Sequence, residues 1–151
     1  MIIGSHVSNS GDQMLLDAAK EAKSYNANTF MVYMGAPQNT VRKDISRFQI
    51  PEMQKYLVEN NIDISHVIVH APYILNFAQP DPVKRQFASD FLVQEIEYAY
   101  QAGFKTIVIH PGAHVKEGIE VGLKHIASSL KEVLKRTEHT DVVIALETMA
   151  G

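Results

Sequence analysis

Two histidines and one glutamate each stand at the end of a short apolar run, at His70, His110 and Glu147. Two imidazoles and a carboxylate suit Zn²⁺, Mn²⁺ or Fe²⁺ and leave coordination positions open. The sequence contains no cysteine, so any metal must be held by His, Asp or Glu. The three residues therefore predict one divalent-metal site. The alternative is a polar rim of hydrogen-bonded groups around a sugar or phosphate ligand.

Two further histidines are candidates for supporting roles near this site. His6 closes the first apolar run and is expected to line the site or to support its ligands. His114, in HPGAH, is a second candidate for such a role. His66 lies four residues before His70, about 13 Å away along the same expected strand, which predicts a structural role. The histidines expected to be solvated or capping are His125 and His139.

Short runs rich in β-branched residues alternate with longer segments of helical spacing. The runs cover residues 2–6, 29–34, 67–70, 106–110 and 142–147. This alternation of short apolar runs and helical segments predicts an α/β fold with about five parallel strands and four helices. Because side chains alternate along a strand, His70 shares a face with Ile68 and His110 with Val108. The side chains at the carboxyl ends of neighbouring strands are thus expected to converge at one rim.

The first, third and fourth helical segments each have an apolar stripe on one face, as expected for helices that cover a sheet. The third segment opens with Asp81-Pro82, a capping residue followed by a proline, and closes near Gly103. The second, less regular segment covers about 46–59, with Pro51 near its start or at a kink. The stripe of the first segment is Leu15, Ala18, Ala19 and Ala22. That of the third is Ala88, Phe91, Leu92, Ile96 and Ala99, and that of the fourth is Leu123, Ile126, Leu130, Val133 and Leu134.

Two architectures use this alternation: an open doubly wound sheet and a (β/α)₈ barrel. A dinucleotide-binding sheet requires a GxGxxG turn after its first strand, and this chain has SHVSNSG there. The barrel is therefore favoured. A whole barrel takes about 250 residues, so residues 1–151 are interpreted as one incomplete barrel domain.

Composition limits the function classes without choosing among them. The formal net charge is −3, which is not the basic excess typical of nucleic-acid binders. The N-terminal residues show no basic segment followed by a long apolar run, so no signal peptide is predicted. No apolar stretch approaches the roughly 20 residues that span a bilayer. A cytoplasmic protein without membrane contact is expected.

Five segments together resemble endonuclease IV, and most closely its Gram-positive bacterial members. The segments are GSHVS at 4–8, TFMVYMGAPQNT at 29–40, VHAPYILN at 69–76, HPGAH at 110–114 and ALETMAG at 145–151. The resemblance implies a TIM barrel with three zinc ions that acts on double-stranded DNA. It implies cleavage of the phosphodiester 5′ to abasic sites and removal of blocking groups from 3′ ends, by zinc-activated water.

The resemblance also implies roles for particular residues. His70 and His110 match two ligands of one zinc ion, and Glu147 matches the catalytic carboxylate that bridges this ion to a second one. On a DNA-recognition loop, Tyr73 matches an aromatic residue, followed by Ile74 and Asn76. Gln38, in APQNT, stands where some relatives carry a DNA-inserting arginine.

The family's other zinc ligands have no counterpart in this chain, which limits what it is expected to do. At most about one zinc ion is expected to be fully liganded, and the chain alone to be weakly active or inactive. The intact enzyme is expected to be a monomer, and the fragment to be capable of self-association. Two alternatives are a xylose isomerase-like, metal-dependent sugar isomerase and a non-catalytic half-barrel that serves in assembly.

Overall fold

Five short strands lie side by side in the order in which they occur along the chain, and every neighbouring pair is parallel. The computed structural model describes residues 1–148. Its strands are β1 (Gly4–His6), β2 (Thr29–Val32), β3 (Ile68–His70), β4 (Thr106–Ile109) and β5 (Val143–Leu146). The predicted α/β class and all five strands are confirmed, although each strand is shorter than the run that predicted it.

Four α-helices connect the strands: α1 (Leu15–Ser24), α2 (Ile50–Glu59), α3 (Pro82–Ala102) and α4 (Ile119–Arg136). Two short 3₁₀ helices, η1 (Ile45–Arg47) and η2 (Ile64–His66), precede α2 and β3. Pro51 lies in the first turn of α2, where its missing N–H costs no intrahelical bond. The start of this helix is therefore the position that the proline predicted.

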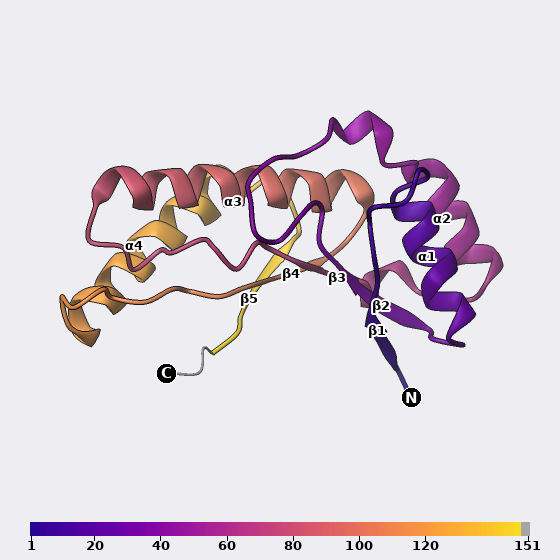
Figure 1. Cartoon of the computed structure of the whole chain (residues 1–151), viewed down its shortest axis with the longest axis horizontal. Helices are drawn as coiled ribbons and strands as arrows, with labels where there is room; N and C mark the ends of the chain where they lie inside the picture. The colour runs from indigo at the N-terminus through magenta and orange to yellow at the C-terminus, as the bar shows by residue number, and fades with distance from the viewer. Residues whose placement is uncertain (149–151) are drawn as a thin grey trace.

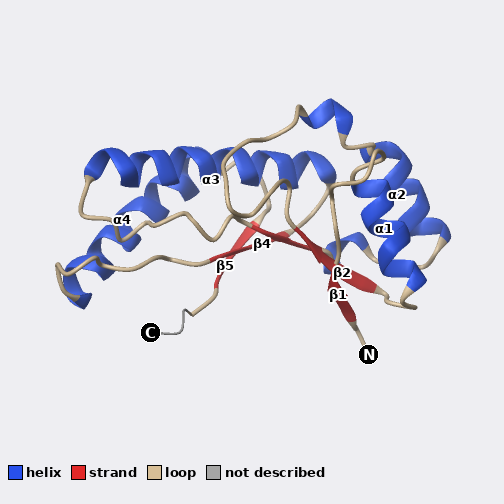
Figure 2. Ribbon diagram, in the orientation of Figure 1, coloured by secondary structure: helices blue, strands red, loops and turns tan. Residues whose placement is uncertain are grey.

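The strand order distinguishes between the two architectures that the sequence left open. A doubly wound sheet reverses its strand order at a switch point, whereas a (β/α)₈ barrel adds strands in sequence. Here the order does not reverse, and the helices lie on one side of the sheet (Figures 1 and 2). α1 packs against α2, and α3 packs against α4. This is the arrangement of part of a TIM barrel.

The core lies between the sheet and this layer of helices. Alternate strand residues point into it and are at most 2% exposed: Phe30, Val32, Val69, Ile107 and Ile109. The predicted stripes on α1 and α3 are buried against them. Because side chains alternate, the residues between these core positions point to the opposite face, which in a barrel is the interior.

The ends of α3 match the signals in the sequence. The carboxylate of Asp81 accepts hydrogen bonds from the backbone N–H groups of Val83, at 2.9 Å, and Lys84, at 3.4 Å. Gly103 ends the helix with a φ of +87°, a left-handed conformation that favours glycine. These two residues therefore define the length of the helix that carries Glu95.

Two expectations about individual positions are wrong. On α4, Ile126, Leu130 and Val133 face the core, but Leu123 and Leu134 are more than half exposed. Those two residues flank the stripe on a side of α4 that no described element covers. His66 ends the 3₁₀ helix η2 instead of extending β3, and its backbone carbonyl accepts a hydrogen bond from the Thr29 hydroxyl. The structural role expected of its side chain stays a prediction.

The last three residues of the ALETMAG motif, 149–151, lie outside the described residues. Within residues 1–148, no helix combines the length and the apolar character needed to cross a membrane.

Candidate metal centre

Three neighbouring strands bring His70, His110 and Glu147 to one rim of the sheet. His70 is the last residue of β3, His110 directly follows β4, and Glu147 directly follows β5. Their potential ligand atoms all lie within 4.8 Å of one another, and they form the one such group of His, Asp and Glu found within residues 1–148. The convergence therefore agrees with the alternation of side chains along the predicted strands.

The environment of the three side chains changes from buried to open across the group. The His70 side chain is 5% exposed, that of His110 is 22% exposed, and that of Glu147 is 50% exposed. The Nε2 atom of His70 lies 3.0 Å from Glu147 Oε2, and Nε2 of His110 lies 4.0 Å from the same oxygen. One carboxylate oxygen thus faces both imidazoles, while the other side of the group is open to a ligand.

The backbone determines which nitrogen of His70 is available. Its Nδ1 lies 2.7 Å from the carbonyl oxygen of Ala71, and a carbonyl can only accept a hydrogen bond. Nδ1 therefore carries the proton, and in the neutral ring the lone pair of Nε2 points at the Glu147 carboxylate. Two acceptors at 3.0 Å require a positive charge between them, which a metal ion or a proton supplies. The donor set and this orientation fit a divalent metal.

Aromatic rings extend from the group toward β1. The ring of Tyr33 lies between His6, at 4.6 Å between centroids, and His70, at 5.1 Å. The rings of His70 and His110 are also 5.1 Å apart. His6 therefore contacts Tyr33, which in turn contacts His70, and this is consistent with the expected place of His6 beside the site.

Burial has opposite effects on the pKa values of these two outer rings. It lowers the pKa of His6, and the neighbouring His70 lowers it further, while Glu21 raises it. It raises the pKa of Tyr33, and the charges of Glu147 and Tyr73 add to that shift. Both shifts favour the uncharged form of the ring.

His114 is not brought into this group. It is exposed in the loop before α4, and its Nδ1 accepts a hydrogen bond from the backbone N–H of Gly118 at 3.2 Å. Gly118 directly precedes α4, as its N-cap residue. The visible contact of His114 is thus with the start of a helix.

Loops beyond the strands carry the residues for which the sequence predicts DNA contact. Tyr73 and Ile74 follow β3 and are 51% and 46% exposed, and Gln38 is exposed in the loop after β2. Asn76 instead uses its side chain within the protein. Its Nδ2 donates to the carbonyl of Ala113, and its Oδ1 accepts from the N–H of Ala78, both at 2.9 Å.

Asn76 thereby joins the loop after β3 to the HPGAH segment. It also explains the glycine in that segment, because a Cβ at Gly112 would lie 2.1 Å from Asn76 Oδ1. Gly112 also has a φ of +98°, which favours glycine. Through this contact Asn76 fixes the loop that follows His110, while Tyr73 and Ile74 remain free to meet a ligand.

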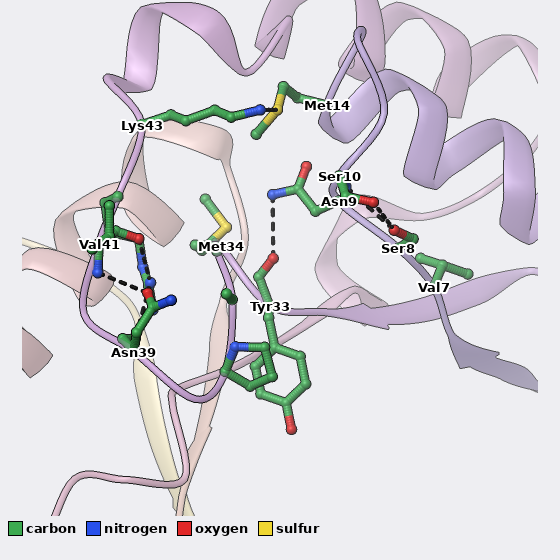
Figure 3. Close-up of a pocket in the computed structure, with 14 residues that line it drawn as sticks. Val7, Ser8, Asn9, Ser10, Met14, Tyr33, Met34, Asn39, Val41 and Lys43 are labelled. Atoms are coloured by element: carbon green, nitrogen blue, oxygen red, sulfur yellow. Dashed lines mark hydrogen bonds between the residues drawn. The ribbon is translucent and has the colours of Figure 1, made fainter.

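A cavity of about 420 Å³ lies between the loops that follow β1 and β2, and it shares Tyr33 with the surroundings of the group. Asn9 Nδ2 crosses it to donate to the backbone carbonyl of Tyr33 at 3.2 Å, and Lys43 Nζ lies 3.4 Å from the sulfur of Met14 (Figure 3). The backbone of Tyr33 thus lines this cavity, while its ring packs between His6 and His70.

Tyr33 is the residue near the site that the sequence analysis missed. The second run was expected to end at Met34, which would have made Met34 the strand-end residue, but β2 ends at Val32. Alternation from Met31 would have placed Tyr33 on the face of His70. The alternation of side chains along the strand therefore predicts the position of Tyr33, whereas the expected last residue of the strand does not.

Comparison with known proteins identifies relatives over the whole chain. Residues 19–151 match the family model described as xylose isomerase-like TIM barrel. The chain is 46% identical, over 151 residues, to a protein of Acholeplasma laidlawii named probable endonuclease 4, covering 100% of this chain and 51% of that protein. It is 52% identical over 150 residues to the Bacillus subtilis protein of the same name, covering 99% and 49%.

Solved structures support the same fold. Endonuclease IV from Thermus thermophilus aligns with a TM-score of 0.80 at 18% identity, covering 99% of this chain and 53% of that one. A D-tagatose 3-epimerase-like protein aligns with a TM-score of 0.64 at 21% identity, covering 99% and 54%. At these identities the structures establish the fold alone.

The chain spans about half the length of the curated relatives it matches. The predicted barrel fold and the resemblance to endonuclease IV, Gram-positive members included, are confirmed. The ligand and DNA-contact roles of individual residues stay predictions.

Proposed function

Because this chain belongs to the xylose isomerase-like TIM-barrel family, we propose that it is part of a DNA-repair endonuclease of the endonuclease IV type. The reaction is hydrolysis of the phosphodiester 5′ to an abasic site in double-stranded DNA, with trimming of blocked 3′ ends. The observation that carries the proposal is the convergence of His70, His110 and Glu147 in a chain about half identical to proteins named probable endonuclease 4.

His70, His110 and Glu147 are proposed to hold one zinc ion. Zinc accepts imidazole nitrogen and carboxylate oxygen, and the Nδ1–H of His70 bonded to a carbonyl is the usual support for such a ligand. A bound zinc ion supplies Lewis acidity and lowers the pKa of a water ligand toward about 7. Glu147, half exposed, has room to interact with a second ion or with the attacking water, which is the catalytic role proposed for it.

Double-stranded DNA is proposed to lie across the loops after β2 and β3. Tyr73 and Ile74 offer exposed apolar surface that can support a base stack opened at an abasic site. Gln38 offers an amide to a groove without adding charge, and Asn76 holds the loop of Tyr73 in place. A bound divalent ion adds the positive charge that the net charge of −3 does not supply.

The ligands of further zinc ions are expected to come from outside this chain, so the chain alone is proposed to be weakly active or inactive. The intact enzyme is proposed to act as a monomer in the cytoplasm. For the chain alone, self-association through β1 and β5, the outermost strands of the sheet within residues 1–148, is a second expectation. Sedimentation of a compact dimer that binds no metal would favour the non-catalytic assembly module.

A metal-dependent sugar isomerase is the alternative, since the matching family model is described as a xylose isomerase-like TIM barrel. The two functions differ in substrate, so the test offers both. Metal analysis of the purified chain is combined with binding and cleavage of an abasic-site duplex, an undamaged duplex and free ketoses. We expect about one zinc ion per chain and preferential binding of the abasic duplex. Sugar isomerisation without abasic-DNA binding would overturn the proposal, and rapid turnover by this chain would contradict its weak activity.

A further inference from the structure

An ion pair between Arg42 and Glu95 lies buried outside the candidate metal centre. Arg42 Nε lies 2.6 Å from Glu95 Oε1, and the two side chains are 2% and 0% exposed. Burial raises the pKa of the Glu95 carboxyl, while the hydrogen bond and charge of Arg42 oppose that shift. The pair joins α3, which carries Glu95, to the loop of residues 33–44 after β2, called here the β2 loop.

The pair is not arranged for greatest stability. Within residues 1–148, Arg42 Nη2 and Glu95 Oε2 are both buried without a hydrogen-bond partner. Desolvation of two charges offsets much of their attraction, and apolar side chains in their place are often as stable. The burial of these charges is therefore better explained by the loop backbone that Arg42 holds in place.

Arg42 contacts both limbs of the β2 loop. Its Nη1 donates to the carbonyls of Val41, at 2.9 Å, and Asn39, at 3.3 Å. On the other limb, a Cβ at Gly35 would lie 2.7 Å from the same nitrogen, so the backbone there passes directly against the guanidinium. The guanidinium carbon lies 4.8 Å above the ring of Phe91 on α3. One side chain thus fastens the whole loop to the helix layer.

The loop held in this way presents Gln38. A backbone hydrogen bond from Asn39 N–H to the Ala36 carbonyl, at 3.3 Å, closes the turn that exposes it. The Asn39 side chain accepts from the N–H of Val41 at 2.9 Å, which closes the next turn (Figure 3). Arg42 bonds the carbonyl of Asn39, the residue directly after Gln38, and so holds the backbone beside Gln38.

We propose that Arg42 and Glu95 are positioning residues for DNA binding, which fix the β2 loop in its binding shape before the duplex arrives. A loop ordered in advance loses less conformational entropy on binding. The pair touches no proposed metal ligand, so its contribution is to DNA affinity and not to zinc affinity. This inference rests on the proposed function.

The test replaces both charges at once, because removing one would leave the other buried and unpaired. The variant Arg42→Met with Glu95→Met keeps the space filled but removes the bonds to the β2 loop. We expect amide hydrogen exchange of residues 35–43 to become at least about tenfold faster, with exchange in β3 and β4 unchanged. Affinity for an abasic duplex, measured by fluorescence anisotropy at fixed salt, should fall about tenfold.

Zinc affinity distinguishes a positioning role from a general structural role, because a general loss of structure would lower it. We expect it to stay within about twofold of the parent chain in the double variant, with Tm within a few degrees. Arg42→Lys alone keeps the charge, but its single nitrogen cannot occupy the positions of both Nε, which bonds Glu95, and Nη1, which bonds the two carbonyls, so it should not keep the slow exchange of the parent. Replacing the exposed pair by Lys105→Gln with Asp141→Asn is the matched control, expected to change none of these quantities.

Parent-like loop exchange and DNA affinity in the Arg42→Met, Glu95→Met variant would overturn the inference. A parallel fall of zinc affinity, Tm and DNA affinity would overturn it too, since the pair would then support the fold as a whole. A parent chain that does not bind the abasic duplex would instead count against the proposed function. Faster loop exchange would in that case still support the ordering role of the pair.

Discussion

His70 donates its Nδ1–H to the carbonyl oxygen of Ala71 across 2.7 Å, and this single bond orients the imidazole toward the other two members of the candidate centre. The acceptor is the backbone of the next residue, so the orientation is built into the end of β3. With its proton on Nδ1, His70 turns Nε2 toward the Glu147 carboxylate at 3.0 Å, a contact that requires a proton or a metal ion between the two atoms. A metal ion in that place satisfies both groups, which is the basis of the first two predictions.

Replacement of His110 by alanine should remove zinc binding while leaving the fold nearly intact. The side chain is partly exposed at the rim, so its loss opens little of the core. Losing one of three ligands should lower zinc affinity by more than about 100-fold, beyond the effect typical of supporting residues. Zinc per chain is measured by atomic emission after dialysis against a zinc buffer.

His125→Ala is the control for that experiment. His125, on α4, pairs at 3.3 Å with Glu117, which lies just before that helix, and it does not belong to the group of three. It should retain the zinc content of the parent. Equal zinc content in both variants would mean that His110 is not a ligand.

Glu147→Gln should weaken zinc binding without changing the volume of the site. The amide keeps a carbonyl oxygen but removes the charge that offsets the divalent ion, and we expect about a 10- to 100-fold loss of affinity. Competition with a chromophoric chelator measures this loss. Glu117→Gln, which alters an acid paired with a different histidine, serves as the comparison, and a similar loss there would refute the specific role of Glu147.

Tyr33 should act through its ring and not through its hydroxyl. Tyr33→Phe keeps the ring that stacks on His6 and packs at a tilt against His70, so zinc affinity should stay within about twofold of the parent. Tyr33→Ala removes the wall against which His70 packs and should lower zinc affinity by about tenfold. The same chelator competition distinguishes the two, and an equal loss in both variants would assign the effect to the hydroxyl instead.

The strand-end residues could be predicted because two short-range rules sufficed. Alternation along a strand fixes the face of His70 and His110, and parallel pairing brings the carboxyl ends together. Neither rule needs tertiary detail. Alternation along the strand also predicts the face of Tyr33. However, the predicted run was two residues longer than β2, so Met34 and not Tyr33 was expected near the end of the strand.

Other features depend on contacts that no local pattern contains. The Arg42–Glu95 pair joins residues 53 positions apart, and neither residue stands out in its own segment. The exposure of Leu123 and Leu134 reflects what packs beside α4, whereas the helical period shows only that they flank an apolar stripe. Asn76 was assigned by motif to DNA contact, and its bonds to the loops appear only in three dimensions.

Asp81→Ala should destabilise the fold by about 1 kcal/mol, because the first turn of α3 loses the acceptor for two backbone N–H groups. For a chain of this size that corresponds to a fall in Tm of about 2 to 4 °C. Thermal unfolding followed by circular dichroism measures the change. Asp12→Ala, at an exposed position outside any helix, should leave Tm unchanged, and an equal fall in both variants would rule out a capping effect.

Asp90 should stabilise the packing of α3 on α4 in a pH-dependent way. Its pKa is held below the ordinary value, first by the hydrogen bond from Arg136 and next by that from Gln86. An acid whose pKa is lowered by folding stabilises the folded chain at pH values above its ordinary pKa. That stabilisation is lost as the pH falls through the lowered value, in the region below about pH 4.

Asp90→Asn should therefore lower Tm at pH 7 and not at the acid end of the range. The pair between Asp90 and Arg136 is partly exposed, so solvent screening limits its contribution to about 0.5 kcal/mol, or about 1 to 2 °C in Tm. Unfolding is measured from pH 7 to pH 3 in the presence of a chelator, which removes any contribution of bound metal. The Tm difference between parent and variant should shrink as the pH falls below about 4 and as salt is added. A difference that stayed constant with pH would show that Asp90 acts through packing, because its carboxylate charge would then contribute nothing to the contact between α3 and α4.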